Sequence, residues 1–187
     1  MSQSPVQRLA FQERTRREIM VKSELIPPLP DVVVRVLALL NDGDTEPKDL
    51  EDLLKFEPVL VAKMLALVNS PFYGVQREIR TVKDAVMVLG FRGLKSLLLA
   101  SSTASLLQRD FSCYGHDKNG LWKHSLAVAS GAKSLATFLE HSLDAREELF
   151  VAGLLHDIGK MLLAPYLIER KTVVTSANDS VQREVEA

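Results

Sequence analysis

Cysteine is nearly absent from this sequence, since Cys113 is the only one among 187 residues. A single thiol excludes a disulfide framework within the chain and a zinc cluster built from cysteines. It is consistent with a reducing compartment without identifying one. Cys113 has no basic neighbour closer in sequence than Lys118, so nothing marks it as a nucleophile.

An excess of charge of one sign is also lacking, because 23 basic side chains face 24 acidic ones. This balance creates no general attraction to nucleic acid or to an acidic membrane, and we expect neither as a partner. The start of the chain is polar and charged, unlike a signal peptide. The apolar stretches have about the length of a core helix and are interrupted by charge, so no membrane span is predicted. The expected location is the cytoplasm.

Aromatic residues make up only 6% of the chain, and no segment alternates apolar and polar residues as a strand would. Apolar residues nevertheless reach 47%, with Leu, Val and Ala prominent. Their spacing is helical, and the predicted fold class is all-α. The length suffices for one good core or for two small helical lobes packed together.

Prolines and capping residues predict where the helices begin and end. Ser4-Pro5 opens a first helix that runs to about Lys22, and Pro27–Pro30 forms a stiff extended connector. Residues 108–120 read as a polar loop, and periodicity is lost beyond Lys171. The remaining predicted helices cover about 31–42, 50–54, 58–68, 81–90, 93–107, 121–140 and 144–167.

Three of these boundaries rest on specific residues. Asp31 is the expected cap of the second helix, and Thr81 with Asp84 resembles a capping box. Gly90 is expected to end the helix that this box begins. Asn69-Ser70-Pro71 could be a ligand-binding loop, but we favour a structural helix stop that fixes two lobes against each other.

The most informative motif is His156-Asp157, within the apolar segment Leu154–Lys160. Burying one polar group without a partner costs roughly 2 to 7 kcal/mol, so water, an ion pair or a metal must satisfy this pair. Imidazole and carboxylate both bind divalent ions, and His124 could supply a third ligand. Lys160 lies one turn after His156 and could contact a phosphate oxygen.

A purely structural reading of the same residues stays open. In it, Asp157 pairs with Lys160, His156 donates to a backbone carbonyl, and His124 is a core histidine near Trp122. The two remaining histidines, His116 and His141, lie in polar contexts and are expected at the surface.

These motifs together resemble the HDOD domain, a bacterial relative of the HD phosphohydrolases. The resemblance implies an N-terminal helical lobe packed on an HD-like bundle. We therefore divide the chain into an N-terminal helix (1–24) and an HDOD domain (25–187), with lobes at 25–110 and 111–187. The matching segments are Leu29–Asp31, Pro58–Leu65, Val68–Gly74, Ile79–Ala85, Val88–Gly90, Trp122–Ser125 and Gly153–Lys160.

Family membership would imply bacterial signal transduction, often beside receiver or other sensory domains, without a common catalytic activity. Many members resemble HD enzymes in fold but have lost metal ligands, whereas this chain keeps His124 and His156-Asp157. Its segment Leu155–Lys160 is similar to the metal motif of the HD-GYP cyclic-dinucleotide phosphodiesterases. HD enzymes also use a later Asp, but only Asp179 follows Lys160, with no His and no Gly-Tyr-Pro block. We therefore expect the chain to end before the additional helices with which the family usually continues.

Two functions follow as alternatives. The favoured one is a regulatory signalling module that binds a protein partner or a small ligand such as a nucleotide, with no catalytic residue assigned. The other is a metal-dependent phosphohydrolase with His124, His156 and Asp157 as ligands and Lys160 as a phosphate contact. Iron, manganese and zinc are the candidate ions, and an ion retained without turnover would be structural or sensory.

Overall fold

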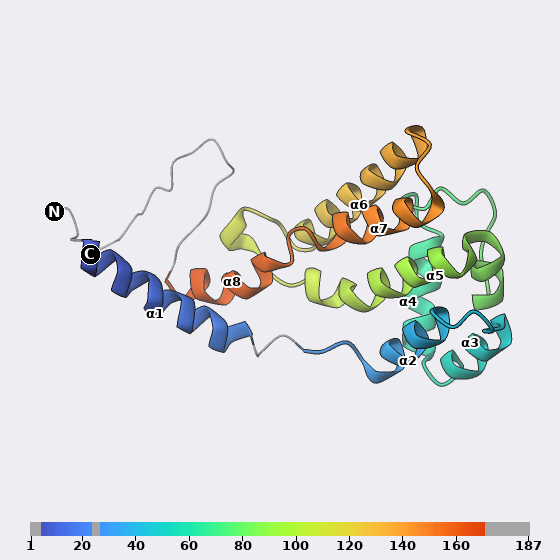
Figure 1. Ribbon diagram of the computed structural model, residues 1–187, viewed down its shortest axis with the longest axis horizontal. Coiled ribbons are helices and arrows are strands. Elements are labelled where there is room, and N and C mark those ends of the chain that lie inside the picture. Colours follow the sequence, from blue (N-terminus) through green and yellow to red (C-terminus); the bar gives the residue numbers. More distant parts are fainter. Residues whose placement is uncertain (1–4, 24–26, 171–187) are drawn as a thin grey trace.

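The computed structural model describes residues 5–23 and 27–170, and all regular elements in these ranges are helical (Figure 1). The predicted all-α class is therefore confirmed. Ser4, Asp179 and the segment beyond Lys171 lie outside the described residues. In chain order the elements are α1 (Pro5–Ser23), α2 (Asp31–Leu40), α3 (Pro47–Leu54), α4 (Pro58–Val68), α5 (Val82–Leu107), the 3₁₀ turn η1 (Ser112–Tyr114), α6 (Gly120–Phe138), α7 (Leu143–Leu155) and α8 (Gly159–Glu169).

Most helices begin at the predicted residues. Pro58 opens α4 as predicted, whereas α3 begins at Pro47, before the predicted start at about residue 50. A missing backbone N–H costs nothing at either position. The Thr81–Asp84 capping box at the start of α5 is present with both of its hydrogen bonds. The prediction for Asp31 was wrong, because Pro30 is the N-cap and Asp31 is the first helical residue. There its carboxylate lies in the first turn, where the helix dipole favours negative charge.

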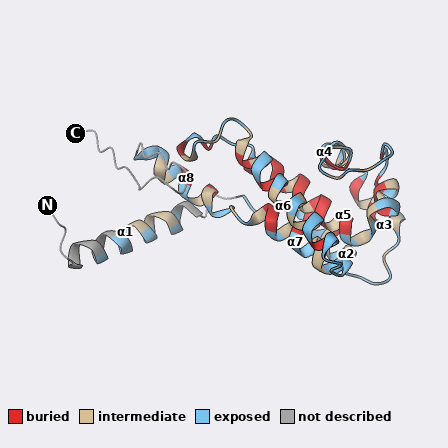
Figure 2. Cartoon of the chain, turned by 90° about the horizontal axis from the view of Figure 1, so that it is seen from above, coloured by how far each residue is buried: buried red, intermediate tan, exposed pale blue. Residues whose placement is uncertain are grey.

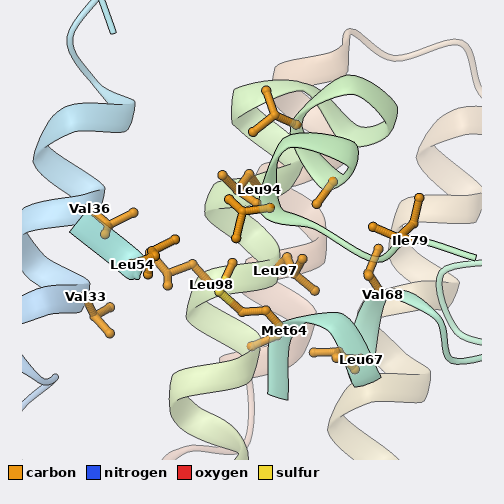
Figure 3. Close-up of a cluster of buried hydrophobic side chains, with 14 of the residues drawn as sticks. Val33, Val36, Leu54, Met64, Leu67, Val68, Ile79, Leu94, Leu97 and Leu98 are labelled. Carbon is orange, nitrogen blue, oxygen red and sulfur yellow. The ribbon is translucent and has the colours of Figure 1, made fainter. Parts of the chain in front are cut away.

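Helix α5 is the centre of the core. It packs against α2, α3 and α4 and also against α6 and α7. Figure 2 shows buried residues concentrated in this group of helices, whereas α1 carries exposed and intermediate ones. Apolar side chains of α2, α3 and α4 converge on α5 (Figure 3). The buried residues at this contact are Val33, Val36, Leu54, Met64, Leu67 and Val68 on these three helices and Leu94, Leu97 and Leu98 on α5.

Gly90 ends the first helical segment of α5, as predicted, and a second helical segment follows it across a kink. Its φ of +68° and ψ of 176° are non-helical, and the helical segments on either side form one kinked element. A residue with a Cβ would be strained at this positive φ. The two helices predicted for 81–90 and 93–107 are therefore the two arms of α5.

The helix predicted for 144–167 is divided into α7 and α8. Between them the backbone hydrogen bonds run from residue i+3 to residue i, as in Ile158 N to Leu155 O and Lys160 N to Asp157 O, both 2.9 Å. The chain also starts this region earlier than predicted, with Ser142 rather than Asp144 before the first turn. The His-Asp motif thus lies in a tight turn between two helices and not within one helix.

The segment 108–120 is polar in composition, but two of its residues are buried in an apolar cluster. Phe111 and Cys113 are buried against Leu107, Leu121 and Met161, forming a second small core under α8. Burial raises the pKa of the Cys113 thiol, in keeping with the absence of a nucleophilic role.

Helix α1 lies alongside α8, at one end of the molecule (Figure 1). The hydroxyls of Thr15 and Tyr166 are 3.3 Å apart, and Arg170 Nη2 lies 3.4 Å from Glu18 Oε2. The connector after α1 is non-helical at residues 27–30, as the prolines predicted.

Two helical stretches, 82–107 and 143–169, are long and apolar enough to cross a membrane. The sequence prediction had found no such stretch, because it treated the charged residues as interruptions. The first stretch bends at Gly90 and is the core helix of the fold, and the second contains the turn after α7. Core helices of soluble proteins pass the same test, so these two stretches are weak support for a membrane span.

Candidate metal centre

A close contact between α6 and α7 positions the candidate ligands. Gly153 of α7 lies so near Ala129 of α6 that an added Cβ would be 2.8 Å from the Ala129 Cα. No larger residue fits against that backbone without moving a helix. This contact brings His156, one turn after Gly153, beside His124 of α6.

The three predicted ligands converge. His124 Nε2 lies 3.3 Å from His156 Nε2 and 3.4 Å from Asp157 Oδ2. The third side, from His156 Nε2 to Asp157 Oδ2, measures 3.2 Å. We call these residues the HD triangle. All three ligand atoms lie within 4.8 Å of one another.

The tautomer of His156 follows from its other ring nitrogen. His156 Nδ1 lies 2.7 Å from the Gly153 carbonyl oxygen, which can only accept a hydrogen bond. Nδ1 therefore carries the proton, and in the neutral ring the Nε2 lone pair faces His124 and Asp157. Metal-binding histidines are commonly held in this way by a hydrogen bond from the opposite nitrogen.

Lys160 lies against the same triangle. Its ammonium group donates to Asp157 Oδ2 at 2.7 Å and lies 5.7 Å from the centre of the Tyr114 ring. Burial acts to raise the pKa of Asp157, but the Lys160 hydrogen bond and charge and the two histidines hold it below its ordinary value. The carboxylate is ionised at neutral pH.

The structural reading of the motif is met in part. The predicted ion pair between Asp157 and Lys160 and the predicted hydrogen bond from His156 are both present. The prediction that His124 is a core histidine fails, because its side chain is 44% exposed. The HD triangle is therefore open to solvent on one side.

The dimensions of the triangle fit one divalent ion. Two ligand atoms each about 2.05 Å from a tetrahedral ion are about 3.3 Å apart. The three measured separations, 3.2 to 3.4 Å, match one face of such a tetrahedron. Two imidazoles and a carboxylate suit zinc, iron or manganese. When bound, such an ion would polarise a phosphate oxygen or lower the pKa of a bound water.

A fourth ligand is not part of this group. Within the described ranges, no other histidine, cysteine or carboxylate joins the three in a common ligand cluster. The later Asp of HD enzymes thus has no counterpart among residues 27–170, and Asp179 lies outside them.

His116 was misjudged as a surface residue. It is half-buried, and its ring centre lies 6.0 Å from that of His124. Burial, followed by the charges of Lys160 and His124, lowers its pKa. The sequence held no signal for this proximity, since His116 precedes α6 and shares no helical face with His124. His141 is exposed, as predicted.

Asn69 has the structural role predicted for the Asn-Ser-Pro segment. Its Nδ2 donates to the carbonyl oxygens of Leu65 and Ile79, and its Oδ1 accepts from Ile79 N, all at 2.8 Å. Ser70 Oγ donates to Leu67 O at 2.6 Å. The segment ends α4 and ties the following loop to it.

The same block contacts α7 through Tyr73. Its ring centre lies 5.7 Å from that of Phe150 of α7, and the Lys133 ammonium lies 5.9 Å and 5.6 Å from the two ring centres. Lys133 forms an ion pair with Glu147, whose side chain is 15% exposed. Burial, followed by the Glu147 charge, raises the pKa of Tyr73. We call these four residues the junction cluster.

Comparison with known proteins identifies the family. A model of the HDOD domain matches residues 26–187. An uncharacterised protein of Treponema pallidum (strain Nichols) is 27% identical over 138 residues, which are 73% of this chain and 26% of that protein.

Two crystal structures are similar, each at 29% sequence identity. An HDOD domain protein of unknown function from Geobacter sulfurreducens gives a TM-score of 0.59, covering 84% of this chain and 57% of that one. A Shewanella amazonensis SB2B protein, provisionally named a phosphohydrolase, gives a TM-score of 0.63. The match covers 82% of this chain and 52% of that protein. The chain thus spans less than two thirds of each of these three relatives.

The matched region includes the Asn-Ser-Pro-Phe-Tyr-Gly block, His124 and the His-Asp turn. The resemblance inferred from the motifs agrees with the family model and with both structures. The chain belongs to the HDOD domain family, which is related to the HD phosphohydrolase superfamily.

Proposed function

We propose that this chain is a regulatory module of bacterial signal transduction whose HD triangle binds a divalent metal ion and, through it, a phosphate-bearing small ligand. The observation that carries the proposal is the triangle itself, with separations of 3.2 to 3.4 Å. Iron, manganese and zinc are the candidate ions, because the ligands are two nitrogens and one oxygen.

Binding rather than hydrolysis is proposed because the site lacks the further carboxylate of HD enzymes among residues 27–170. An ion held by three protein ligands keeps open positions that phosphate oxygens can occupy. Lys160 lies beside these positions, where its ammonium group could pair with phosphate once the metal shares Asp157. A nucleotide is the small ligand that fits this chemistry.

The partners belong to the same proposal. A regulatory module of this kind would act on signalling proteins or on fused sensory or receiver domains in the cytoplasm. The balanced charge gives no support for nucleic acid or a membrane surface as a partner.

A metal-dependent phosphohydrolase is the second candidate. The Lys160 ammonium beside the triangle favours it, and so does the provisional name of the Shewanella relative. In this case His124, His156 and Asp157 would hold the ion, and Lys160 would steady the phosphate during attack by water.

Elemental analysis of protein purified without chelator tests the metal, with His156→Ala as the control. We expect near-stoichiometric metal in the wild type and its loss in the variant. Wild-type protein that folds normally and contains no metal, even after incubation with Zn²⁺, Mn²⁺ or Fe²⁺, would refute the proposal.

Hydrolysis of bis(p-nitrophenyl) phosphate and of a cyclic dinucleotide separates the two candidates. The regulatory module should bind the cyclic dinucleotide or inorganic phosphate in the presence of metal without releasing product above the free-metal background. Turnover that disappears in His156→Ala would replace the favoured function with the phosphohydrolase.

A further inference from the structure

Three imidazole rings lie in a row at the edge of the HD triangle. The ring centres of His124 and His156 are 5.2 Å apart, and those of His116 and His124 are 6.0 Å apart. The outermost ring, His116, comes from the loop between η1 and α6. The row therefore joins three segments of the chain that all meet beside Asp157.

The ring of His116 is free to serve a ligand. Its nitrogens have no hydrogen-bond partner among the described residues, although its backbone N–H donates to Phe111 O at 3.4 Å. Gly120 leaves room for the ring, since an added Cβ there would lie 3.0 Å from His116 Cβ and 3.4 Å from Nδ1. The backbone is thus tied to the small core, and the side chain packs closely against Gly120.

His116 must move to reach a common ion. When two imidazoles bind one tetrahedral ion at about 2.0 to 2.1 Å, their ring centres are about 5 Å apart. His124 and His156 already have this spacing, at 5.2 Å, whereas His116 stands off from His124 by 6.0 Å. His116 lies outside the group of three ligand atoms in this structure, so its side chain would have to change rotamer to direct a nitrogen at the ion.

We propose that His116 is a fourth protein ligand of the metal ion held by the HD triangle. This inference rests on the proposed metal binding and deepens it. It supplies a protein ligand from the loop before α6, where the resemblance to HD enzymes implied a carboxylate from a later helix. The resulting set of three imidazoles and one carboxylate favours zinc or iron over the hard ions magnesium and calcium.

The ligand set also determines the charge of the site. A divalent ion with one carboxylate and three neutral imidazoles keeps a net positive charge of one. Replacement of the missing carboxylate by an imidazole therefore makes the site more attractive to an anion such as phosphate. Because four protein ligands complete a tetrahedral site, a phosphate oxygen would have to occupy a fifth position on the ion.

Titration of the metal-free protein with Co²⁺, followed by visible absorption and calorimetry, tests this assignment. We compare His116→Ala with His141→Ala, which removes an exposed histidine at the other end of α6. His116→Ala should weaken Co²⁺ binding at least tenfold and change the d–d spectrum, whereas His141→Ala should change neither.

A ligand swap provides a readout that a structural role cannot imitate. In His116→Cys, a thiolate bound to Co²⁺ should give a charge-transfer band in the near ultraviolet, and this band should be absent from His141→Cys. The swap keeps the assignment testable even if His116→Ala is poorly folded by circular dichroism.

The possible failures are distinguishable. Co²⁺ binding that is lost in His124→Ala but unchanged in His116→Ala, with no thiolate band in His116→Cys, overturns the role of His116 and leaves the proposed function intact. A wild-type protein that binds no Co²⁺, Zn²⁺ or Mn²⁺ overturns both the role of His116 and the proposed function.

Discussion

Helices α6 and α7 carry two polar clusters that differ in almost every respect. The junction cluster is largely buried, and within it Lys133 and Glu147 neutralise each other under the rings of Tyr73 and Phe150. The HD triangle is half-open to solvent. In it the ligand atoms of two histidines and Asp157 converge, and those of His156 and Asp157 are acceptors.

The distance between the clusters explains how one helix pair supports both. Lys133 follows His124 by nine residues on α6, or about 14 Å along the helix. At the junction the protein supplies its own cation and closes the cluster. At the His-Asp turn the acceptors outnumber the Lys160 ammonium, so an external cation can add binding energy. The first arrangement stabilises the fold, and the second binds a ligand.

The largest expected effect comes from Tyr73→Ala. It removes a ring packed on Phe150 and should lower the free energy of unfolding by about 3 kcal/mol in urea denaturation. Metal affinity should not change. Tyr73→Phe is the matched control, because the buried hydroxyl has no hydrogen-bond partner among the described residues. It should stay within about 1 kcal/mol of wild type, and a larger loss would show that the hydroxyl matters more than the ring.

Lys133→Met should follow, because it leaves the Glu147 carboxylate without its cation. Since the two side chains are 29% and 15% exposed, we expect a loss of about 2 to 3 kcal/mol. The double variant Lys133→Met, Glu147→Leu should recover most of that loss. If the single variant were as stable as wild type, the pair would contribute nothing to the junction, and the contrast between the clusters would weaken.

Gly153→Ala connects the two clusters, because it pushes α6 and α7 apart. An overpacked contact of this kind costs about 2 kcal/mol. It should also move His156 away from His124 and reduce metal affinity, measured by Zn²⁺ titration. Gly131→Ala on α6 is the control, since an added Cβ there meets nothing within 4 Å. A Gly153 variant with normal affinity would separate ligand placement from the helix contact.

The smallest effect on stability is expected from Asp157→Asn in the presence of chelator. The lowered pKa of Asp157 means that its stabilising contribution is present above the ordinary carboxyl pKa of about 4 and is lost as the pH falls through the folded value. At pH 7 the variant should be less stable by about 0.5 kcal/mol, and the difference should shrink as the pH falls below the ordinary carboxyl pKa. A difference independent of pH would exclude the ion pair with Lys160 as its source.

Much of the fold could be predicted, because local chemistry determines where the helices begin. Pro58 at the start of α4 and the Thr81–Asp84 box act within one turn, so the sequence alone reveals them. The start of α3 at Pro47 was instead placed at about residue 50. The break after α7 could not be foreseen. Its i+3 to i hydrogen bonds interrupt a segment whose apolar spacing continues on both sides.

The site was foreseen in part for a similar reason. His124, His156 and Asp157 were found through motifs, and the structure brings them together. His116 was missed because its position depends on tertiary packing of the loop around Phe111 and Cys113, whose burial the polar composition conceals. The contact at Gly153 was equally hidden, since it depends on a neighbour from another helix.

The hydrogen bonds of Asn69 impose a chemical constraint beyond size. Its amide offers two donors and one acceptor to three backbone groups. Aspartate has the same shape but no donor when ionised, so it would leave two carbonyl oxygens facing a negative charge. Leucine, of similar branched shape, would leave the N–H and the carbonyl oxygen of Ile79 without this partner, whereas Leu65 O would keep the backbone N–H of residue 69. Among side chains of this length only the carboxamide satisfies every group, so this position accepts no isosteric replacement.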